Sequence, residues 1–278
     1  MTRTQLRVLV LGRGKVGSAL GRALRAAGLA VSCRGRRDGW PRGPIEAQAV
    51  ILALPDAEIG VAARALAHGG RLGARGCTAL LHCAGGLGPE VLAPARGPRV
   101  AVAQMHPLVS FASARHPPSL GGAYLLVDGD PPAARLARAL GRRLGMRPFT
   151  PAALDRTLYH AAASLAAGGA AALGAAGVEL LEAAGIDSPR AAAMLGALLR
   201  TVADNVARLG LPAALTGPVR RGDDAILGRH LDAVGRRVPQ WLPLYAALGR
   251  AQLRLARKLG EAPARSLAQM ARALHEGK

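Results

Sequence analysis

The chain has 278 residues, enough for two domains of ordinary size, each with its own core. Half of its residues are hydrophobic and 19% are charged, which is typical of a globular protein and argues against long disordered segments. The formal net charge of +20 would ordinarily suggest a nucleic-acid partner, but only 3% of residues are aromatic and the basic residues are spread along the chain. We therefore predict no nucleic-acid partner.

The cysteines and the start of the chain bear on the compartment. Cys33, Cys77 and Cys83 show no CxxC spacing and leave one residue over after any pairing, so no disulfide framework is predicted. The residues after Met1 lead directly into a short β-like stretch, without the longer apolar region of a signal peptide. We predict a cytoplasmic protein.

Strands and helices alternate in the first half of the chain. Strands are predicted at 6–11, 29–33, 49–54, 78–83, 100–105 and 123–127, and helices at 16–28, 56–67 and 131–144. This alternation implies a mostly parallel sheet covered by helices on both faces. The predicted fold is a Rossmann-type, doubly wound α/β domain in residues 1–150.

The second half, residues 151–278, is predicted to be an all-helical domain. Helices are expected near 153–185, 188–209, 223–235, 241–260 and 263–275. The uncharged run Ala161–Val178 reaches the minimum length of a membrane span, but it is mostly Ala and Gly and two glutamates follow it closely. We predict no membrane span, and instead a small-residue helix that another backbone approaches closely, within the domain or across a dimer.

A glycine-rich turn follows the first predicted strand and opens the first helix. Gly12, Gly14 and Gly17 match the G-x-G-x-x-G pattern. In that position the first glycine permits a tight turn, the second lets a pyrophosphate approach the backbone, and the third lets helix and strand pack closely. The whole turn is therefore predicted to bind a dinucleotide: Gly12, Arg13, Gly14, Lys15, Val16 and Gly17.

The residues after the second strand indicate which dinucleotide binds. NAD-binding proteins place an acid there for the ribose 2′-OH, whereas NADP-binding proteins place cations. This chain has Arg34, Arg36 and Arg37 at that point, and the only nearby acid, Asp38, follows them. The sequence therefore predicts that the cofactor is NADP(H).

Loops at the carboxyl ends of the next strands are predicted to flank the ribose and nicotinamide of that cofactor. They contain Leu54 and Pro55 after one strand and Ala84 and Gly85 after the next. His82 is interpreted either as part of this site or as a residue of a plain loop. No metal site is predicted.

Two histidines are candidates for proton transfer. His106 precedes Pro107, which is expected to end the strand ladder so that His106 points into the crevice. His160 lies four residues before Ser164 on one helical face. Each histidine is interpreted either as a catalytic group or as a structural one.

A polar turn in the helical half, Thr216–Asp224, is the densest polar cluster of the chain. Asp223 or Asp224 is expected to cap the following helix, and Arg220 or Arg221 to bind an acid with both arms of its guanidinium. The alternative is a capping turn with surface arginines. If the turn is catalytic, Arg221 would anchor a substrate carboxylate and Asp223 would belong to the site.

Four segments appear together in order: the turn Gly12–Gly17, Met105–Phe111, Tyr159–Ala162 and Thr216–Asp223. Together they resemble bacterial proteins that pair a Rossmann-like domain with a C-terminal helical domain of unknown function. These proteins look like distant relatives of ketopantoate reductase, pyrroline-carboxylate reductase and the 6-phosphogluconate dehydrogenase group. The resemblance implies NADP dependence and a homodimer formed through the helical domain.

One position departs from the pattern of the resembling proteins, which usually have an Asn where this chain has Gly168. If that Asn orients substrate, this chain uses Ser164 and Asn205 instead or has different chemistry. The sequence thus predicts an NADPH-dependent reductase that moves hydride to a C=O or C=N carbon of a small, carboxylate-bearing substrate bound between the two domains. The alternative is an NADP(H)-binding sensor or scaffold without turnover.

Overall fold

The computed structural model describes residues 6–68, 70–74 and 78–276. Contacts divide the chain into two compact units, with the division between Ala167 and Gly168. The last strand ends at Phe149 and the long helix that follows begins at Arg156, so the change from mixed to purely helical structure comes close to residue 150.

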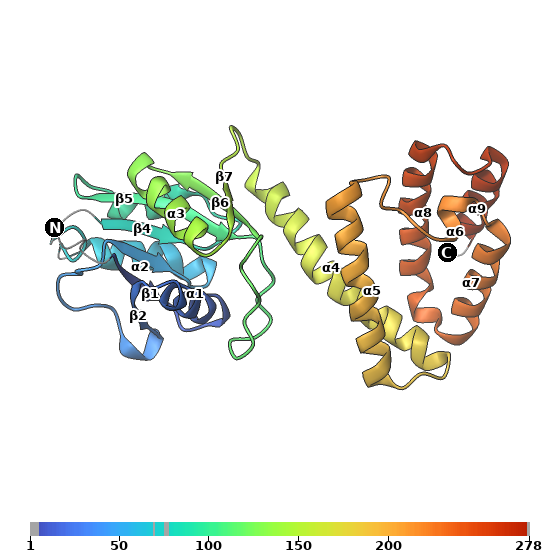
Figure 1. The fold of residues 1–278 in the computed structure, drawn as a ribbon, viewed down its shortest axis with the longest axis horizontal. Helices are drawn as coiled ribbons and strands as arrows, with labels where there is room; N and C mark the ends of the chain where they lie inside the picture. Colours follow the sequence, from blue (N-terminus) through green and yellow to red (C-terminus); the bar gives the residue numbers. More distant parts are fainter. Residues whose placement is uncertain (1–5, 69, 75–77, 277–278) are drawn as a thin grey trace. The chain divides into compact units, whose positions relative to one another are not determined.

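Seven strands of the first unit form one sheet in the order β2-β1-β3-β4-β5-β6-β7 (Figure 1). The strands are β1 (Arg7–Leu11), β2 (Ala30–Arg34), β3 (Ala49–Leu52), β4 (Thr78–His82), β5 (Val100–Pro107), β6 (Tyr124–Gly129) and β7 (Arg147–Phe149). All neighbouring pairs are parallel except β5 with β6. The predicted Rossmann-type, mostly parallel sheet is confirmed.

Helices cover both faces of this sheet. They are α1 (Lys15–Ala26), α2 (Asp56–Ala67) and α3 (Pro131–Arg143), with 3-10 segments η1 (Arg36–Asp38) and η2 (Pro89–Ala95). Successive strand residues point to opposite faces, so Val8 and Val10 lie in a core with α1 and α3, while Leu9 and Leu11 lie in a core with α2 and η2. The sheet is therefore held between two apolar layers, and the carboxyl ends of its strands continue into the connecting loops.

Two details of the sheet differ from the sequence prediction. β5 continues to Pro107 instead of ending at Met105, because the pairing with β6 carries on past the proline: Pro107 lies opposite Leu125, and the Leu108 N–H donates to the Tyr124 carbonyl. Proline removes one donor and does not end an antiparallel pair whose other bonds remain. β7 has only three residues, too few to show an alternating pattern, and was not predicted.

The remaining helices follow in chain order. They are α4 (Arg156–Ala183), α5 (Ser188–Leu209), α6 (Pro218–Arg221), α7 (Asp224–Arg237), η3 (Pro239–Trp241), α8 (Leu242–Leu259) and α9 (Ala264–Glu276). The core of the second unit joins α6, α7, α8 and α9 through Val219, Leu227, Leu253, Met270 and Leu274. The prediction of helices without strands is confirmed for the described residues after Phe149, with the short α6 as an addition.

α4 and α5 contribute little to either core. Ala176 and Ala191 are their only buried residues within the described chain. Gly177 faces the Leu195 side chain, where a β-carbon would lie 2.8 Å from Cδ1, so the neighbour at this glycine is a side chain and not the backbone that the sequence predicts. Among the described helices, α4 alone is long and apolar enough to cross a membrane, by length and composition only.

Candidate functional site

The glycine-rich turn between β1 and α1 has the geometry that the sequence predicts. Gly12 has a φ of +121°, and a β-carbon there would lie 2.1 Å from the Ala53 carbonyl oxygen. A β-carbon on Gly17 would lie 2.0 Å from the Gly12 carbonyl oxygen. Both positions therefore require glycine, the first for the turn and the second for the contact of helix with strand.

Gly14 differs from the other two glycines, because no atom lies within 4 Å of the place a β-carbon would take. It is the N-cap of α1, and the first N–H groups of a helix have no acceptor inside the helix. The open space thus lies at a helix end that carries free donors and a partial positive charge. Lys15 and Val16 supply the backbone donors next to it.

The turn after β2 gathers cations around one acid. Asp38 accepts a hydrogen bond from the Gly35 N–H at 2.7 Å and lies 3.5 Å from the Arg13 guanidinium. Arg34 donates to the backbone carbonyl of Asp38 at 2.9 Å. The Asp38 carboxylate is therefore engaged in holding the turn, and Arg36 and Arg37 extend from the 3-10 segment that it closes.

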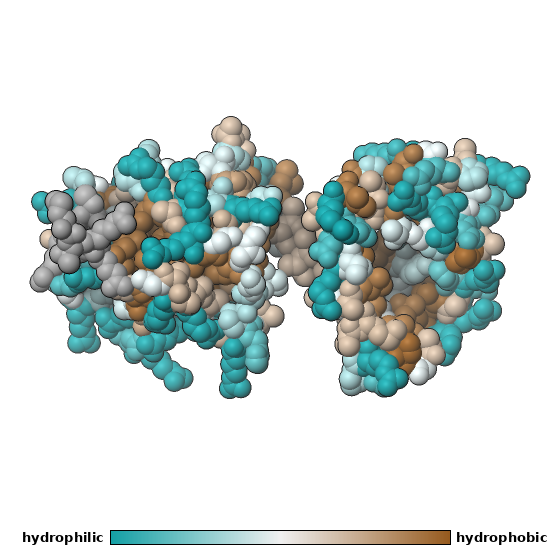
Figure 2. Space-filling view, in the orientation of Figure 1, coloured by the Kyte–Doolittle hydropathy of each residue, from teal (hydrophilic) through white to brown (hydrophobic). Residues whose placement is uncertain are grey.

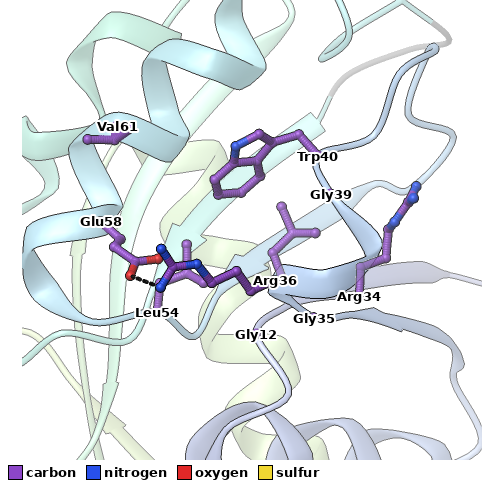
Figure 3. A pocket seen from close by; sticks show the side chains of 10 residues that line it. Gly12, Arg34, Gly35, Arg36, Gly39, Trp40, Leu54, Glu58 and Val61 are labelled. Carbon is purple, nitrogen blue, oxygen red and sulfur yellow. Dashed lines mark ion pairs between the residues drawn. The ribbon is translucent and has the colours of Figure 1, made fainter.

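A cavity of ≈ 310 Å³ lies between this turn, the glycine turn and the start of α2 (Figure 3). Its lining residues are Leu11, Gly12, Arg34, Gly35, Arg36, Gly39, Trp40, Leu54, Glu58 and Val61. Figure 3 shows the Trp40 indole and the Arg36 and Glu58 side chains around one opening, with Arg36 and Glu58 paired at 3.8 Å. Sequence reasoning missed Trp40, Glu58 and Val61, although an isolated Trp directly after the arginine cluster of an aromatic-poor chain was a usable signal.

A second hollow, a groove of ≈ 570 Å³, lies at the end of β5 and along the first turns of α4. It is lined by His106, Leu108, Val109, Ser110, Tyr159, His160, Ala162, Ala163, Ser164, Ala166 and Ala167. The structure therefore brings together His106, His160 and Ser164, which the sequence singled out separately. None of these lining residues is an arginine or lysine.

His106 and Tyr159 form the central contact of this groove. The His106 Nδ1 and the Tyr159 hydroxyl are 2.9 Å apart, and the two rings meet edge to face with centroids 5.6 Å apart. Burial, and next the nearby His160, lower the pKa of His106 to about 4, while burial raises the pKa of Tyr159. At neutral pH the pair therefore consists of a neutral imidazole and a protonated phenol. Tyr159 begins the segment Tyr159–Ala162, but nothing in the sequence ranks it above its neighbours.

The loop after β4 approaches both histidines. A β-carbon on Gly85 would lie 2.8 Å from His106 Nε2 and 3.1 Å from His160 Cδ2, and one on Gly86 would lie 3.3 Å from His160 Nδ1. Glycine is thus the residue that lets this backbone reach the two rings. Ala84 precedes it and is buried. His82, in contrast, is fully buried at the end of β4, and its Nε2 lies 3.1 Å from the Gly88 carbonyl oxygen.

Other predicted site residues belong to the second unit. Asp223 caps α7 by accepting from the Ile226 N–H at 3.2 Å, as predicted for Asp223 or Asp224. Arg220 binds both carboxylate oxygens of Glu261 at 2.8 Å, which lowers the pKa of Glu261. Arg221 is exposed, and within the described part of the chain its guanidinium has no assigned partner.

Asn205 and Gly168 have no special setting in the structure. The Asn205 side chain accepts from Arg208 at 3.3 Å, and no atom lies within 4 Å of a β-carbon position on Gly168. Within the described residues, no group of three His, Cys, Asp or Glu side chains is arranged to hold a metal ion.

Comparison with known proteins bears out the resemblance. Residues 123–252 match the model of a family described as Domain of unknown function (DUF2520). No curated protein matches the chain significantly.

Several solved structures share the fold. A Bacteroides fragilis protein named as a candidate NADP oxidoreductase is 19% identical with a TM-score of 0.67, over 89% of this chain and 98% of that one. Pyrroline carboxylate reductase from Plasmodium falciparum with NADP bound is 10% identical with a TM-score of 0.58, over 98% of both chains. A reductive aminase from Aspergillus terreus in complex with NADPH and ethyl levulinate is 16% identical with a TM-score of 0.55, over 89% and 94%. These likenesses establish the fold, which is one found in complexes with NADP and NADPH.

Proposed function

We propose that the protein is an NADPH-dependent reductase that delivers hydride to the carbon of a C=O or C=N group in a small substrate. The observation that carries the proposal is the open helix end at Gly14 beside a cavity lined by arginines and Trp40. The NADP and NADPH complexes among the similar structures support the same cofactor for this chain. A reductase also needs a proton donor, and the groove of His106 and Tyr159 supplies a candidate.

The residues of the first unit fit the cofactor part by part. The pyrophosphate suits the free N–H groups at the start of α1 next to Gly14. The 2′-phosphate suits the guanidinium groups of Arg34, Arg36 and Arg37, because arginine binds phosphate with two parallel hydrogen bonds. Asp38, which would oppose a 2′-phosphate, is engaged by Gly35 and Arg13. Leu54 and the Trp40 indole offer apolar surface for the adenine.

The reaction also requires a proton at the atom that becomes negatively charged. The cofactor supplies the hydride. Tyr159 is the proposed proton donor, because its raised pKa keeps the phenol protonated and its partner His106 holds the hydroxyl in place. His160 and Ser164 line the same groove and are proposed to donate hydrogen bonds to the substrate oxygen or nitrogen.

The first experiment separates cofactor binding from turnover. NADPH and NADH are titrated against the protein while the fluorescence of Trp40 is followed, in a Trp241→Phe background that leaves one indole. We expect saturable quenching by NADPH with clearly weaker binding of NADH. Oxidation of NADPH at 340 nm is then measured with a panel of 2-oxo acids, their ethyl esters, ketones and cyclic imines. No NADPH binding, or binding without turnover of any compound, contradicts the proposal.

The panel also tests whether the substrate carries a carboxylate. The groove lining contains no arginine or lysine, so recognition of a carboxylate depends on a residue outside it. The proposed anchor is Arg221, which is exposed and has no assigned partner among the described residues. We expect a 2-oxo acid to react faster than its ester, and Arg221→Gln to remove that preference. Arg220→Gln is unsuitable as a control because Arg220 holds Glu261; Arg229→Gln, at an exposed position of α7, is the matched control.

The alternative function is an NADP(H)-binding sensor or scaffold without turnover. It is favoured by one observation, that no lysine lines the groove. The two functions are distinguished by Tyr159→Phe, which leaves NADPH affinity unchanged in both cases and reduces activity only in an enzyme.

We propose that α4 and α5 pack against a second copy of the chain. Nine of the twelve large hydrophobic side chains that the structure describes as exposed lie between Leu158 and Leu211. On α5 they recur every four residues, at Met194, Leu198, Val202 and Val206, and so form one stripe. Figure 2 shows tan and brown surface among the teal side chains of the second, helical unit.

The molar mass of the protein, measured by light scattering as it elutes from a size-exclusion column, tests this proposal. We expect a dimer for the wild type and a monomer for the double variant Leu198→Gln, Val202→Gln, with Tyr124→Gln in the first unit as the control. Sedimentation of the protein with phosphatidylglycerol vesicles would instead assign the apolar helices to a membrane.

We also propose a cytoplasmic location. Cys33 and Cys83 are free thiols, as suits a reducing compartment, while Cys77 lies outside the described residues. Cell fractionation with an antibody to the protein tests it.

A further inference from the structure

Two buried polar side chains lie side by side under the loop that approaches the groove. His82 ends β4, Gln104 lies opposite it on β5, and both are fully buried. Apart from Thr78, they are the only buried polar or charged residues of the described chain. Polar groups in an otherwise apolar sheet cost free energy unless they bind specific partners, so each of these side chains is expected to have one.

Each of these side chains holds one end of the same loop. The Gln104 Nε2 donates to the Ala84 carbonyl at 2.8 Å and lies 3.5 Å from that of Gly85. The His82 Nε2 lies 3.1 Å from the Gly88 carbonyl, which can only accept, so this ring nitrogen carries the proton. Burial lowers the pKa of His82 to about 4, so the ring is neutral and makes this bond as a neutral donor.

The loop between these two bonds is the one that reaches the two groove histidines. Gly85 and Gly86 approach the rings of His106 and His160 so closely that a β-carbon would collide or nearly collide. A loop of glycines has little conformational preference of its own. The bonds at Ala84 and Gly88 therefore supply the rigidity that the glycines lack.

We propose that Gln104 and His82 are positioning residues that fix the Ala84–Gly88 loop. They thereby hold its glycines against the two histidines of the groove. The inference rests on the proposed function, because it expects the nicotinamide end of NADPH to lie against this loop. Neither side chain touches the groove itself, since neither is among its lining residues. Their effect is transmitted through the backbone of the loop.

The test uses two ligands that share one end. NADPH has both the 2′-phosphoadenosine and the nicotinamide, whereas 2′,5′-bisphosphoadenosine has only the first and is expected to occupy only the cavity of Trp40. We expect Gln104→Met, which removes the donor but keeps the length of the side chain, to weaken NADPH binding about tenfold and leave 2′,5′-bisphosphoadenosine binding unchanged. Removing the other bond with His82→Phe is expected to act in the same direction.

The control is Gln48→Met, the same substitution in the same unit. Gln48 precedes β3 at the opposite end of the strands and accepts from the Arg7 N–H. We expect it to change neither ligand's affinity. Hydrogen exchange of peptides covering residues 84–88 provides a second measurement, and faster exchange is expected in Gln104→Met but not in Gln48→Met.

The outcomes separate the inference from the proposed function. A wild-type protein that binds no NADPH overturns the proposed function. If the wild type binds NADPH and both loop variants bind it equally well, the positioning role is wrong. Loss of both ligands, or failure of both variants to fold, would show that His82 and Gln104 support the fold alone and would likewise overturn the inference.

Discussion

The two hollows of the first unit are built in different ways. The cavity beside the glycine turn is made by backbone: Gly12 and Gly17 each have a conformation or contact that a side chain would change, and the arginines around the turn are largely exposed. The groove of His106 is made by side chains that come from distant parts of the chain, since the His106–Tyr159 pair is separated by 53 positions. Its central groups, His106 and Tyr159, are partly buried and neutral.

This difference predicts different responses to change. A site made by backbone tolerates no added atom at the glycines whose contacts are tightest, Gly12 and Gly17. A site made by partly buried neutral side chains responds to protonation and to the loss of single hydrogen-bonding atoms. Four substitutions or conditions probe the contrast.

The largest effect is expected at the glycine turn. Gly12→Ala places a β-carbon 2.1 Å from the Ala53 carbonyl oxygen at a φ of +121°, so the turn must move. We expect the free energy of unfolding to fall by roughly 3 kcal/mol or more and NADPH binding to be lost. Urea unfolding and NADPH titration measure the two effects.

Gly14→Ala is the matched control for this change. No atom lies within 4 Å of the added carbon, so stability is expected to stay within about 0.5 kcal/mol of the wild type while NADPH affinity falls, because the methyl group occupies the ligand's space. Equal destabilisation by both alanines would contradict the assignment of the open space to a ligand.

Acid is expected to lower the free energy of unfolding of the first unit through His82 and His106. Burial lowers the pKa values of His82 and His106 from 6.5 to about 4. Above pH 6.5 folded and unfolded forms are both neutral and the full stability is present; between pH 6.5 and about 4 only the unfolded form takes up protons, so the free energy of unfolding decreases. For fully buried His82 the loss is on the order of 3 kcal/mol.

The measurement compares unfolding at pH 7.5 and 4.5, with Trp40 fluorescence as the probe in the Trp241→Phe background. His82→Gln is expected to remove a large part of the pH dependence, and His116→Gln, at an exposed position of the same unit, is the control. A pH dependence that is the same in both variants would rule out His82 as its source.

Loss of one oxygen atom tests the proton donor. Tyr159→Phe keeps the ring against His106 but removes the hydroxyl, and we expect kcat to fall about 100-fold with the affinity for NADPH unchanged. The second unit contains a matched pair, because His230 Nδ1 and the Tyr245 hydroxyl are 2.8 Å apart with the same edge-to-face arrangement of rings. Tyr245→Phe is expected to leave kcat unchanged, and equal losses in both variants would remove Tyr159 from the chemistry.

The same contrast explains how far the sequence predicted the molecule. The glycine turn, the arginine cluster and most strands are local patterns, in which spacing alone carries the physical requirement. Tyr159 could not be ranked, because its importance comes from a contact with a strand 53 positions earlier. The pairing of His82 with Gln104 could not be predicted either, because it depends on the register of β4 against β5. Trp40 is an intermediate case. The sequence shows that it follows the arginines, but not that it lines the cavity.

The smallest expected effect concerns the choice between NADPH and NADH. The Arg36 side chain is 91% exposed and only loosely paired with Glu58 at 3.8 Å, so a 2′-phosphate can recruit it with little loss of existing interactions. We expect Arg36→Gln to weaken NADPH binding about tenfold, or ~1.4 kcal/mol, and to leave NADH binding unchanged. Glu58→Gln, which frees Arg36, is expected to have no effect or to tighten NADPH binding, and Arg115→Gln is the control for loss of one exposed charge. If Arg36→Gln weakens NADH and NADPH equally, Arg36 contacts the adenosine shared by both cofactors rather than the phosphate, and the preference for NADPH must come from Arg34 or Arg37.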